Sequence, residues 1–130
     1  MIKRTVTYTD YNDKVQTEDC YFNLNKIELF ELSLKYGDDL PVILKKMVEE
    51  EDFPGIYDAF KTILHKGYGQ KSEDGRSFLK DEKKTREFEQ SAAYEQLVMD
   101  LLTDKEGAEK FLLGMMPSDV ANGSVAPAIS

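Results

Sequence analysis

Residue types that could do chemistry are scarce in this sequence. The chain has one histidine and one cysteine. A Ser-His-Asp or Cys-His nucleophile would therefore need His65 itself, which precedes Lys66 at an expected helix end, where an imidazole suits the helix dipole. Cys20 lies beside Phe22 in an alternating segment, where a small core residue is the ordinary interpretation. We identify no catalytic residue and predict a non-enzymatic protein.

Two glycine-containing segments superficially resemble ligand-binding loops. Residues 72–75 read Ser-Glu-Asp-Gly, but they lack the Asp-x-Asp-x-Asp-Gly spacing and the twelfth-position Glu of a calcium loop. Residues 67–69 read Gly-Tyr-Gly, and no Gly-Lys-Ser/Thr follows at the distance that a phosphate loop requires. A single histidine also argues against a His-rich zinc site. The sequence therefore predicts no metal ion and no cofactor.

One polar segment has a composition that suits protein contact. Residues 68–76 include two glycines and no helical periodicity, which predicts a loop. Aromatic and long cationic side chains in or beside this loop are typical of protein interfaces. A second interpretation stays open, in which the aromatic rings tuck under the helices and the charges pair with one another. The predicted interaction residues are Tyr68, Lys71, Glu73, Asp74, Arg76 and Phe78.

The elements that must position this loop begin with an expected β-hairpin in the first 24 residues. Apolar and polar residues alternate over 2–8 and again over 20–24. A two-residue turn at Asn12-Asp13 suits the left-handed backbone of a hairpin, but it would place Lys3 opposite Phe22 and mismatch the two faces. We therefore expect a bulge or a longer loop to correct the register.

A helix is expected directly after this hairpin. Asn25 followed by Glu28 is the pattern of a capping box, with Asn25 as the N-cap. Ile27, Phe30 and Leu34 then recur at helical spacing and predict the apolar stripe of this helix.

Further helices are expected to follow as far as residue 116. Helical periodicity resumes near Asp81 after the polar loop and breaks around residues 90–91. Thr103 with Glu106 has the pattern of a second capping box, opening a short last helix. Residues 117–130 are rich in Ser, Ala, Gly and Pro, which predicts a flexible, disordered tail.

These elements predict an α+β fold that is mostly α. A β-hairpin over residues 1–24 leads into about five or six packed helices over 25–116, and the two parts form one domain over 1–116. The chain has 130 residues, which is enough for one domain.

Charge and hydropathy exclude several classes of partner. The formal net charge of −8 argues against nucleic acid and against an anionic membrane, because phosphate groups require a basic face. No apolar run approaches the ~20 residues that span a bilayer. The N-terminus has no apolar stretch of a signal peptide, and a lone cysteine suits a reducing compartment. The sequence thus predicts a soluble cytoplasmic protein.

Six short stretches, taken in order, carry a family resemblance. They are Val6-Thr7-Tyr8-Thr9-Asp10-Tyr11-Asn12, Thr17-Glu18-Asp19, Tyr21-Phe22-Asn23-Leu24, Tyr68-Gly69-Gln70-Lys71-Ser72-Glu73-Asp74-Gly75-Arg76-Ser77-Phe78, Ala93-Tyr94-Glu95-Gln96-Leu97 and Gly114-Met115-Met116-Pro117. With this spacing, the chain resembles the tail assembly chaperones of long-tailed, siphovirus-type bacteriophages or prophages of Gram-positive bacteria over about residues 1–117.

The resemblance implies a function that composition does not indicate. Such chaperones bind the tape measure protein in the cytoplasm of the infected host and keep it soluble. They help to recruit tail tube subunits and are absent from the mature virion. In many relatives a ribosomal frameshift yields a longer product, so a longer form of this chain and a homo-oligomer are further expected partners. The family has no known catalytic residues to transfer.

Two other classes of function stay open from the sequence. One is a structural tail-associated subunit that is retained in the particle. The other is an acidic regulatory protein or inhibitor that mimics nucleic acid. Mimicry would need carboxylates spaced along one face, whereas here they alternate with lysines on ordinary amphipathic helices.

Overall fold

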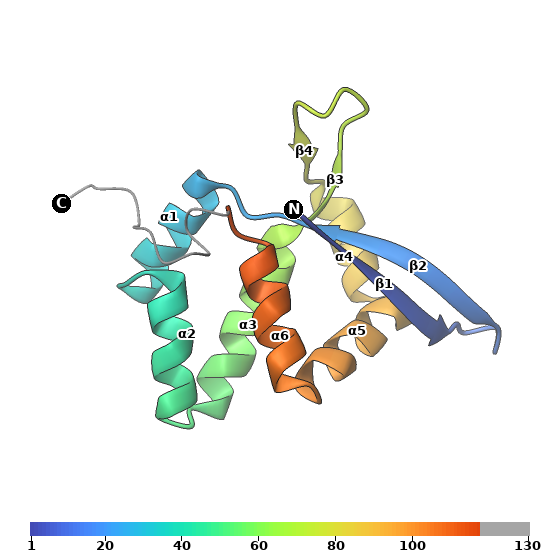
Figure 1. Ribbon diagram of the computed structural model, residues 1–130. Helices are drawn as coiled ribbons and strands as arrows, with labels where there is room; N and C mark the ends of the chain where they lie inside the picture. Colours follow the sequence, from blue (N-terminus) through green and yellow to red (C-terminus); the bar gives the residue numbers. More distant parts are fainter. Residues whose placement is uncertain (118–130) are drawn as a thin grey trace.

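The computed structural model describes residues 1–117, which form a mostly helical fold with an N-terminal antiparallel strand pair (Figure 1). This confirms the predicted α+β class, and the described residues contain six helices. The expected tail lies, apart from Pro117, outside the described residues. The elements in chain order are β1 (Ile2–Thr9), β2 (Val15–Phe22), α1 (Lys26–Tyr36), α2 (Leu40–Glu49), α3 (Phe53–Gly67), β3 (Tyr68–Lys71), β4 (Phe78–Leu79), α4 (Glu82–Glu89), α5 (Ala92–Leu102) and α6 (Lys105–Gly114).

The register of the β1–β2 hairpin matches the two alternating faces. Ile2 lies opposite Phe22, and pairing continues without interruption to Thr9 opposite Val15. Residues 10–14 form the connection, so the expected longer loop is confirmed and a two-residue turn at Asn12-Asp13 is wrong. The Asp10 carboxylate organises this loop by accepting hydrogen bonds from the backbone N–H groups of residues 12 and 14 at 2.8 and 3.0 Å.

The sheet has four strands in the order β1-β2-β3-β4. Strand β3 pairs with β2 only where Tyr21 lies opposite Gly69 and Phe22 lies opposite Tyr68. The rest of the β1–β2 hairpin continues as a two-stranded ribbon, whose strand β1 packs against α5 with Val6 buried. The β3–β4 hairpin projects in another direction (Figure 1). Both hairpins diverge from this short stretch of shared pairing.

Local capping signals explain where the helices begin. The predicted capping box is present, because the Asn25 side chain accepts from the Glu28 N–H at 2.8 Å and the Glu28 carboxylate accepts from the Asn25 N–H at 3.0 Å. Gly37 ends α1 with a φ of 82°, a conformation that favours glycine. Side chains of Asp52, Asp81 and Ser91 likewise accept backbone hydrogen bonds at the starts of α3, α4 and α5.

The second predicted capping box is wrong. The N-cap of α6 is Asp104, whose carboxylate accepts from the Gly107 N–H at 3.0 Å. Thr103 instead ends α5, where its hydroxyl donates to the backbone carbonyl of Met99 at 2.8 Å. A threonine that returns its hydroxyl to the preceding turn is not available as the N-cap of the next helix.

The predicted apolar stripe of α1 is also wrong. Ile27 and Leu34 are 70% and 67% exposed, whereas Leu29 and Leu32 are buried. The helix carries apolar residues on two faces, and only the packing of α1 against its neighbours selects the face with Leu29 and Leu32. Consequently α1 presents two large aliphatic side chains to solvent.

The core is centred on aromatic rings at the base of the β1–β2 hairpin. Phe22 is fully buried and makes an edge-on contact with Phe111 of α6, with ring centroids 5.2 Å apart. The chain immediately after β2 is bonded to two helix ends: Asn23 N–H donates to the Gly67 carbonyl at 2.9 Å, and Leu24 N–H donates to the Met115 carbonyl at 2.8 Å. The base of this hairpin is thus continuous with the helical body.

Candidate interaction site

The polar segment predicted as a loop is a projecting β-hairpin. Gln70 lies opposite Leu79 and Lys71 lies opposite Phe78, so only residues 72–77 form the turn. Sequence periodicity could not indicate these strands, because strand β4 contains only two residues. The prediction of an irregular loop is correct for the tip and wrong for its two legs.

The tip is organised by hydrogen bonds among its own residues. Ser72 N–H donates to the Ser77 carbonyl at 2.8 Å, and the Ser72 hydroxyl accepts from the Ser77 N–H at 3.0 Å. The Asp74 carboxylate accepts from the Ser72 hydroxyl at 2.7 Å and from the Arg76 N–H at 3.0 Å. Gly75 adopts a φ of 73°, which completes the turn. The tip therefore has a defined shape before any partner binds.

Backbone and hydroxyl donors also set the charge state of Asp74. The Arg76 N–H and then the Ser72 hydroxyl stabilise its carboxylate, which lowers the pKa of Asp74 below its usual value. Asp74 is thus ionised at neutral pH, and one of its oxygens is occupied within the turn.

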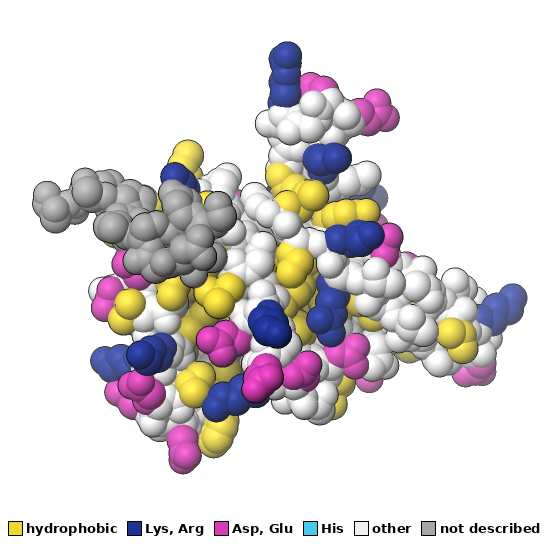
Figure 2. All heavy atoms as spheres, viewed as in Figure 1, with side chains coloured by type: hydrophobic (Ala, Val, Ile, Leu, Met, Phe, Trp, Pro, Cys, Tyr) yellow, Lys and Arg dark blue, Asp and Glu magenta, His cyan; other side chains and the backbone are white. Residues whose placement is uncertain are grey.

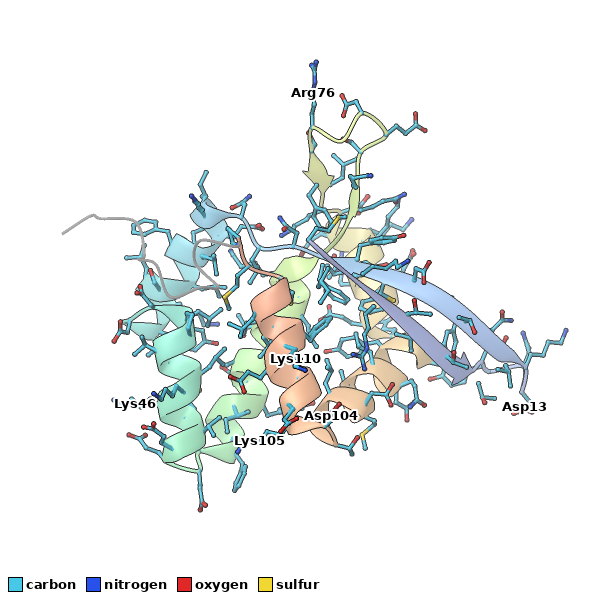
Figure 3. The ribbon with its side chains drawn as sticks, viewed as in Figure 1. Asp13, Lys46, Arg76, Asp104, Lys105 and Lys110 are labelled. Atoms are coloured by element: carbon cyan, nitrogen blue, oxygen red, sulfur yellow. The ribbon has the colours of Figure 1, made fainter. Side chains whose placement is uncertain are left out.

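The structure separates the six predicted interaction residues into two groups. Lys71, Glu73, Asp74 and Arg76 are exposed, and the Arg76 side chain points away from the body at the far end of the hairpin (Figure 3). Figure 2 shows a cationic side chain at this end with acidic side chains beside it. Within the described residues, the side chains of Lys71, Glu73 and Arg76 form no ion pair. These exposed residues at the tip are hereafter the hairpin tip.

Tyr68 and Phe78 lie at the base of the same hairpin. The Tyr68 ring is stacked on Phe88 of α4, with centroids 4.1 Å apart and an interplanar angle of 3°. It also meets the Phe22 ring edge-on at 5.7 Å. Burial raises the pKa of Tyr68, with the neighbouring Cys20 adding to the shift. The interpretation in which rings tuck under the helices is therefore correct for Tyr68, whereas the charged side chains do not pair with one another within the described residues. The contact role of the exposed residues stays a prediction.

Phe78 packs over the backbone of the facing strand. A Cβ atom on Gly69 would lie 2.5 Å from a ring carbon of Phe78 and 2.5 Å from the Leu79 carbonyl oxygen. Gly69 therefore permits the close approach of the ring and the two strands. The half-buried Phe78 contributes to the shape of the base.

Sequence reasoning missed two cationic anchors below the hairpin. Lys80, which directly follows β4, donates three hydrogen bonds to groups from β2, α1 and α3. His65, at the end of α3, contacts Glu89 through Nδ1 at 2.9 Å and Glu82 through Nε2 at 3.1 Å. No sequence signal could have indicated the contacts of Lys80 or those of His65, because both sets of contacts join residues far apart in the chain.

The His65 contacts have a consequence for its protonation. Burial by itself would lower the pKa of His65, but the hydrogen bond and charge of Glu89, followed by those of Glu82, raise it above its usual value. Two carboxylates can only accept hydrogen bonds, so both contacts are satisfied together only by the doubly protonated imidazolium. The imidazolium therefore joins α3 to both ends of α4.

A groove lies beside this histidine. It has a volume of about 550 Å³ and lies between α1 and α3, with Glu89 of α4 at one side. Its lining residues are Glu31, Leu32, Lys35, Asp58, Lys61, Thr62, His65, Lys66 and Glu89. Acidic and basic side chains are mixed along it, and Lys66 pairs with Glu31 at 2.9 Å across it.

The groups that sequence reasoning set aside as catalysts are placed as structural residues. Cys20 is buried in the hairpin base, and burial raises the pKa of its thiol to about 11, so the reactive thiolate is scarce at neutral pH. Across residues 1–117, no three His, Cys, Asp or Glu side chains are grouped so that they could hold a metal ion. Nor is any helix in that part of the chain both long and apolar enough to cross a bilayer.

Comparison with models of known protein families gives one match. It covers residues 1–126, and the family is described as phage tail assembly chaperone. The comparisons with curated proteins and with solved structures gave no match. Because the matched region spans nearly the whole sequence, the chain belongs to the family of phage tail assembly chaperones.

Proposed function

We propose that this protein binds the tape measure protein of a long-tailed phage in the host cytoplasm and keeps it soluble until tail tube subunits assemble around it. In this proposal the protein departs before the virion is complete, and the phage infects a Gram-positive host. Membership of the chaperone family supports a partner among the phage tail proteins and a role without catalysis. The finer identities of the partners come from the resemblance described above.

The observation that carries the proposal is the projecting hairpin tip. It is preorganised by its own hydrogen bonds, and it presents Arg76, Lys71 and Glu73 with no ion pair among the described residues. Preorganised loops lose little conformational entropy on binding, and arginine is enriched among residues that dominate binding energy. We therefore place a principal partner contact at the hairpin tip.

Exposed apolar side chains on the helices supply a second kind of contact. Ile27 and Leu34 lie two turns apart on one face of α1, and Met99 and Leu102 lie one turn apart on α5. Side chains at such spacing can cover the apolar stripe of a partner helix. Figure 2 shows hydrophobic side chains interspersed with charged ones over the helical body. The net charge of −8 would keep such a complex dispersed.

Self-association is a related proposal. β1 is the end strand of the sheet, so its outer edge offers hydrogen-bonding groups to another strand. A second copy, or a longer frameshifted form of the chain, could occupy that edge. Sedimentation of the purified protein alone and together with the longer product would measure both associations.

Co-expression with the tape measure protein tests the main proposal. We expect the two proteins to co-purify and the soluble fraction of the tape measure protein to rise. Arg76→Ala should weaken binding about 30-fold, which corresponds to an arginine contact of about 2 kcal/mol. The matched control is Lys110→Ala on α6, an exposed cation distant from the hairpin tip (Figure 3).

Three outcomes would contradict the proposal. If the protein neither binds nor solubilises the tape measure protein and is found in purified virions by mass spectrometry, it is a structural subunit. If it instead competes with nucleic acid for a DNA-binding protein, it is an acidic mimic. If Arg76→Ala and Lys110→Ala bind equally well, the hairpin tip is not the contact.

A further inference from the structure

Lys80 lies where the β3–β4 hairpin rejoins the helical body. Its ammonium donates to the Asn23 carbonyl at 2.7 Å, to the Lys66 carbonyl at 2.6 Å and to the Glu28 carboxylate at 2.6 Å. These acceptors belong to three separate segments: the chain after β2, the last turn of α3 and the first turn of α1. One side chain thus fastens the end of the hairpin to three parts of the body.

The hydrogen-bonding capacity of the Lys80 ammonium is fully used by these contacts. A lysine ammonium has three donors, and all three are used here. The side chains of Lys80 and Glu28 are only 25% and 16% exposed, so water screens their ion pair weakly. Burial lowers the pKa of Lys80, although the hydrogen bond and charge of Glu28 act in the opposite direction. The Lys66 carbonyl belongs to the helix terminus, where unpaired carbonyl groups favour a cation.

The two legs of the hairpin are attached in different ways. The β3 leg is held by pairing with β2 and by the Tyr68 ring stacked on Phe88. Within residues 1–117, the β4 leg pairs with β3 alone, and Leu79 at its end is 57% exposed. Lys80 is therefore the first residue after β4 that fastens this leg directly to the body. Its ammonium also lies 5.7 Å from the centroid of the Phe78 ring.

We propose that Lys80 is a positioning residue, which holds the β3–β4 hairpin at a fixed angle to the helical body so that the hairpin tip meets its partner in a preorganised geometry. This inference rests on the proposed role of the hairpin tip. Without Lys80, the described residues give the β4 leg no hydrogen bond or ion pair to the body before α4, and the hairpin samples a range of angles. Binding then carries the additional entropic cost of selecting one of them.

The angle can be measured between the ends of the two hairpins. Tyr11→Cys and Ser77→Cys provide exposed sites for two spin labels, while the buried Cys20 thiol, with its pKa of about 11, reacts slowly. Pulsed electron paramagnetic resonance then gives the distribution of distances between the labels. We expect Lys80→Met, which keeps the chain length and removes the donors, to broaden this distribution.

Partner binding is measured on the same substitution without labels. Lys80→Met should weaken binding to the tape measure protein about 10-fold, although Lys80 is placed at the base and makes no contact with the partner. Lys110→Met is the matched control, since this lysine is exposed on α6 and forms no ion pair within the described residues. It should leave both the distance distribution and the affinity unchanged.

A milder variant keeps the test decisive if Lys80→Met folds poorly. Glu28→Gln removes the charge of one acceptor and retains the two carbonyl acceptors, and glutamine still completes a capping box. It should broaden the distribution to an intermediate extent. An unchanged distribution in whichever of these variants folds would overturn the inference.

The two proposals fail in different ways. If Arg76→Ala does not weaken binding, the hairpin tip is not the contact, and the distance distribution alone then decides whether Lys80 fixes the angle. If Arg76→Ala weakens binding while Lys80→Met broadens the distribution and leaves affinity unchanged, the positioning role is overturned and the contact at the hairpin tip stands.

Discussion

The two hairpins of this protein share a motif and differ in what holds them. In the β1–β2 hairpin, pairing runs from Ile2 opposite Phe22 to Thr9 opposite Val15, and one face of its base enters the core. In the β3–β4 hairpin only two cross-strand pairs form. Its attachments are a stacked ring at Tyr68 and the ammonium of Lys80.

This difference indicates how each hairpin is specified. Burial of alternate residues fixes the register of the first, because a shift by one residue would move Phe22 out of the core. The second has no buried face of its own, so its position depends on contacts contributed by β2, α1, α3 and α4. A hairpin attached in this way can place exposed charges far from the body, as Figure 3 shows for Arg76.

Removing the aromatic centre of the first hairpin should have the largest effect. Phe22 is fully buried and contacts the rings of Tyr68, Phe88 and Phe111. Phe22→Ala should lower the free energy of unfolding by about 3–5 kcal/mol, measured by urea denaturation. The control Tyr11→Ala, at a residue 81% exposed in the loop of the same hairpin, should change it by less than about 0.5 kcal/mol. Similar losses of unfolding free energy in both variants would mean that the base and the loop of this hairpin contribute equally to stability.

Crowding the second hairpin should have an intermediate effect. In Gly69→Ala the new methyl group would meet the Leu79 carbonyl oxygen at 2.5 Å, and a backbone atom cannot move aside without opening the strand pair. We expect the free energy of unfolding to fall by about 1–3 kcal/mol and backbone hydrogen exchange in β3 and β4 to become faster. Gly75→Asn is the control, since a Cβ atom added there would meet no atom of the described residues within 4 Å apart from its chain neighbours, and asparagine tolerates the positive φ. A smaller loss for Gly69→Ala than for the control would refute this packing argument.

The stability that His65 contributes through its contacts with Glu82 and Glu89 should depend on pH. Because its pKa is raised in the folded state, His65 contributes stability fully below its unfolded value of about 6.5 and loses that contribution as the pH rises through the folded value. The side chain is 41% exposed, so screening limits the effect to about 0.5 kcal/mol. His65→Gln should therefore destabilise the protein more at about pH 6 than at about pH 8.5. Equal losses at both pH values would show that the imidazolium form is not what joins α3 to α4.

The hairpin tip should contribute least to stability. Arg76→Ala should change the free energy of unfolding by less than about 0.5 kcal/mol, because the side chain is exposed and unpaired within the described residues. Thermal denaturation of the Arg76→Ala and Gly69→Ala proteins, measured side by side, shows whether lost stability explains any loss of partner binding in Arg76→Ala. A loss above about 1 kcal/mol would assign Arg76 a structural role and contradict its assignment to the contact surface.

The predictable parts of the fold are those encoded over a few residues. The capping box of Asn25 and Glu28, the resumption of helical periodicity near Asp81 and the alternation in residues 2–8 each involve neighbours in the chain. The error at Thr103 arose at this same local level, because Asp104 competes for the N-cap and the hydroxyl of Thr103 returns to α5.

The candidate site was predictable only in part. Its composition indicated a contact segment at residues 68–78, and the tip residues lie exposed as that interpretation requires. The inward position of Tyr68 follows from the ring of Phe88, which is contributed by α4. Lys80 anchors the hairpin partly by donating a hydrogen bond to the carbonyl of Asn23, 57 positions away. No sequence periodicity extends over such a separation.

The sequence by itself determined the order of a hairpin and helices, the acidic surface and the family resemblance. Backbone hydrogen bonds within helices and turns act over a few residues, so residue type and spacing are sufficient for these features. Only the tertiary structure decided which apolar face of α1 is buried, how the polar segment forms a second hairpin and which cations hold it. Those outcomes depend on packing and charge pairing between distant segments, whose free energies are realised only when the whole core has assembled.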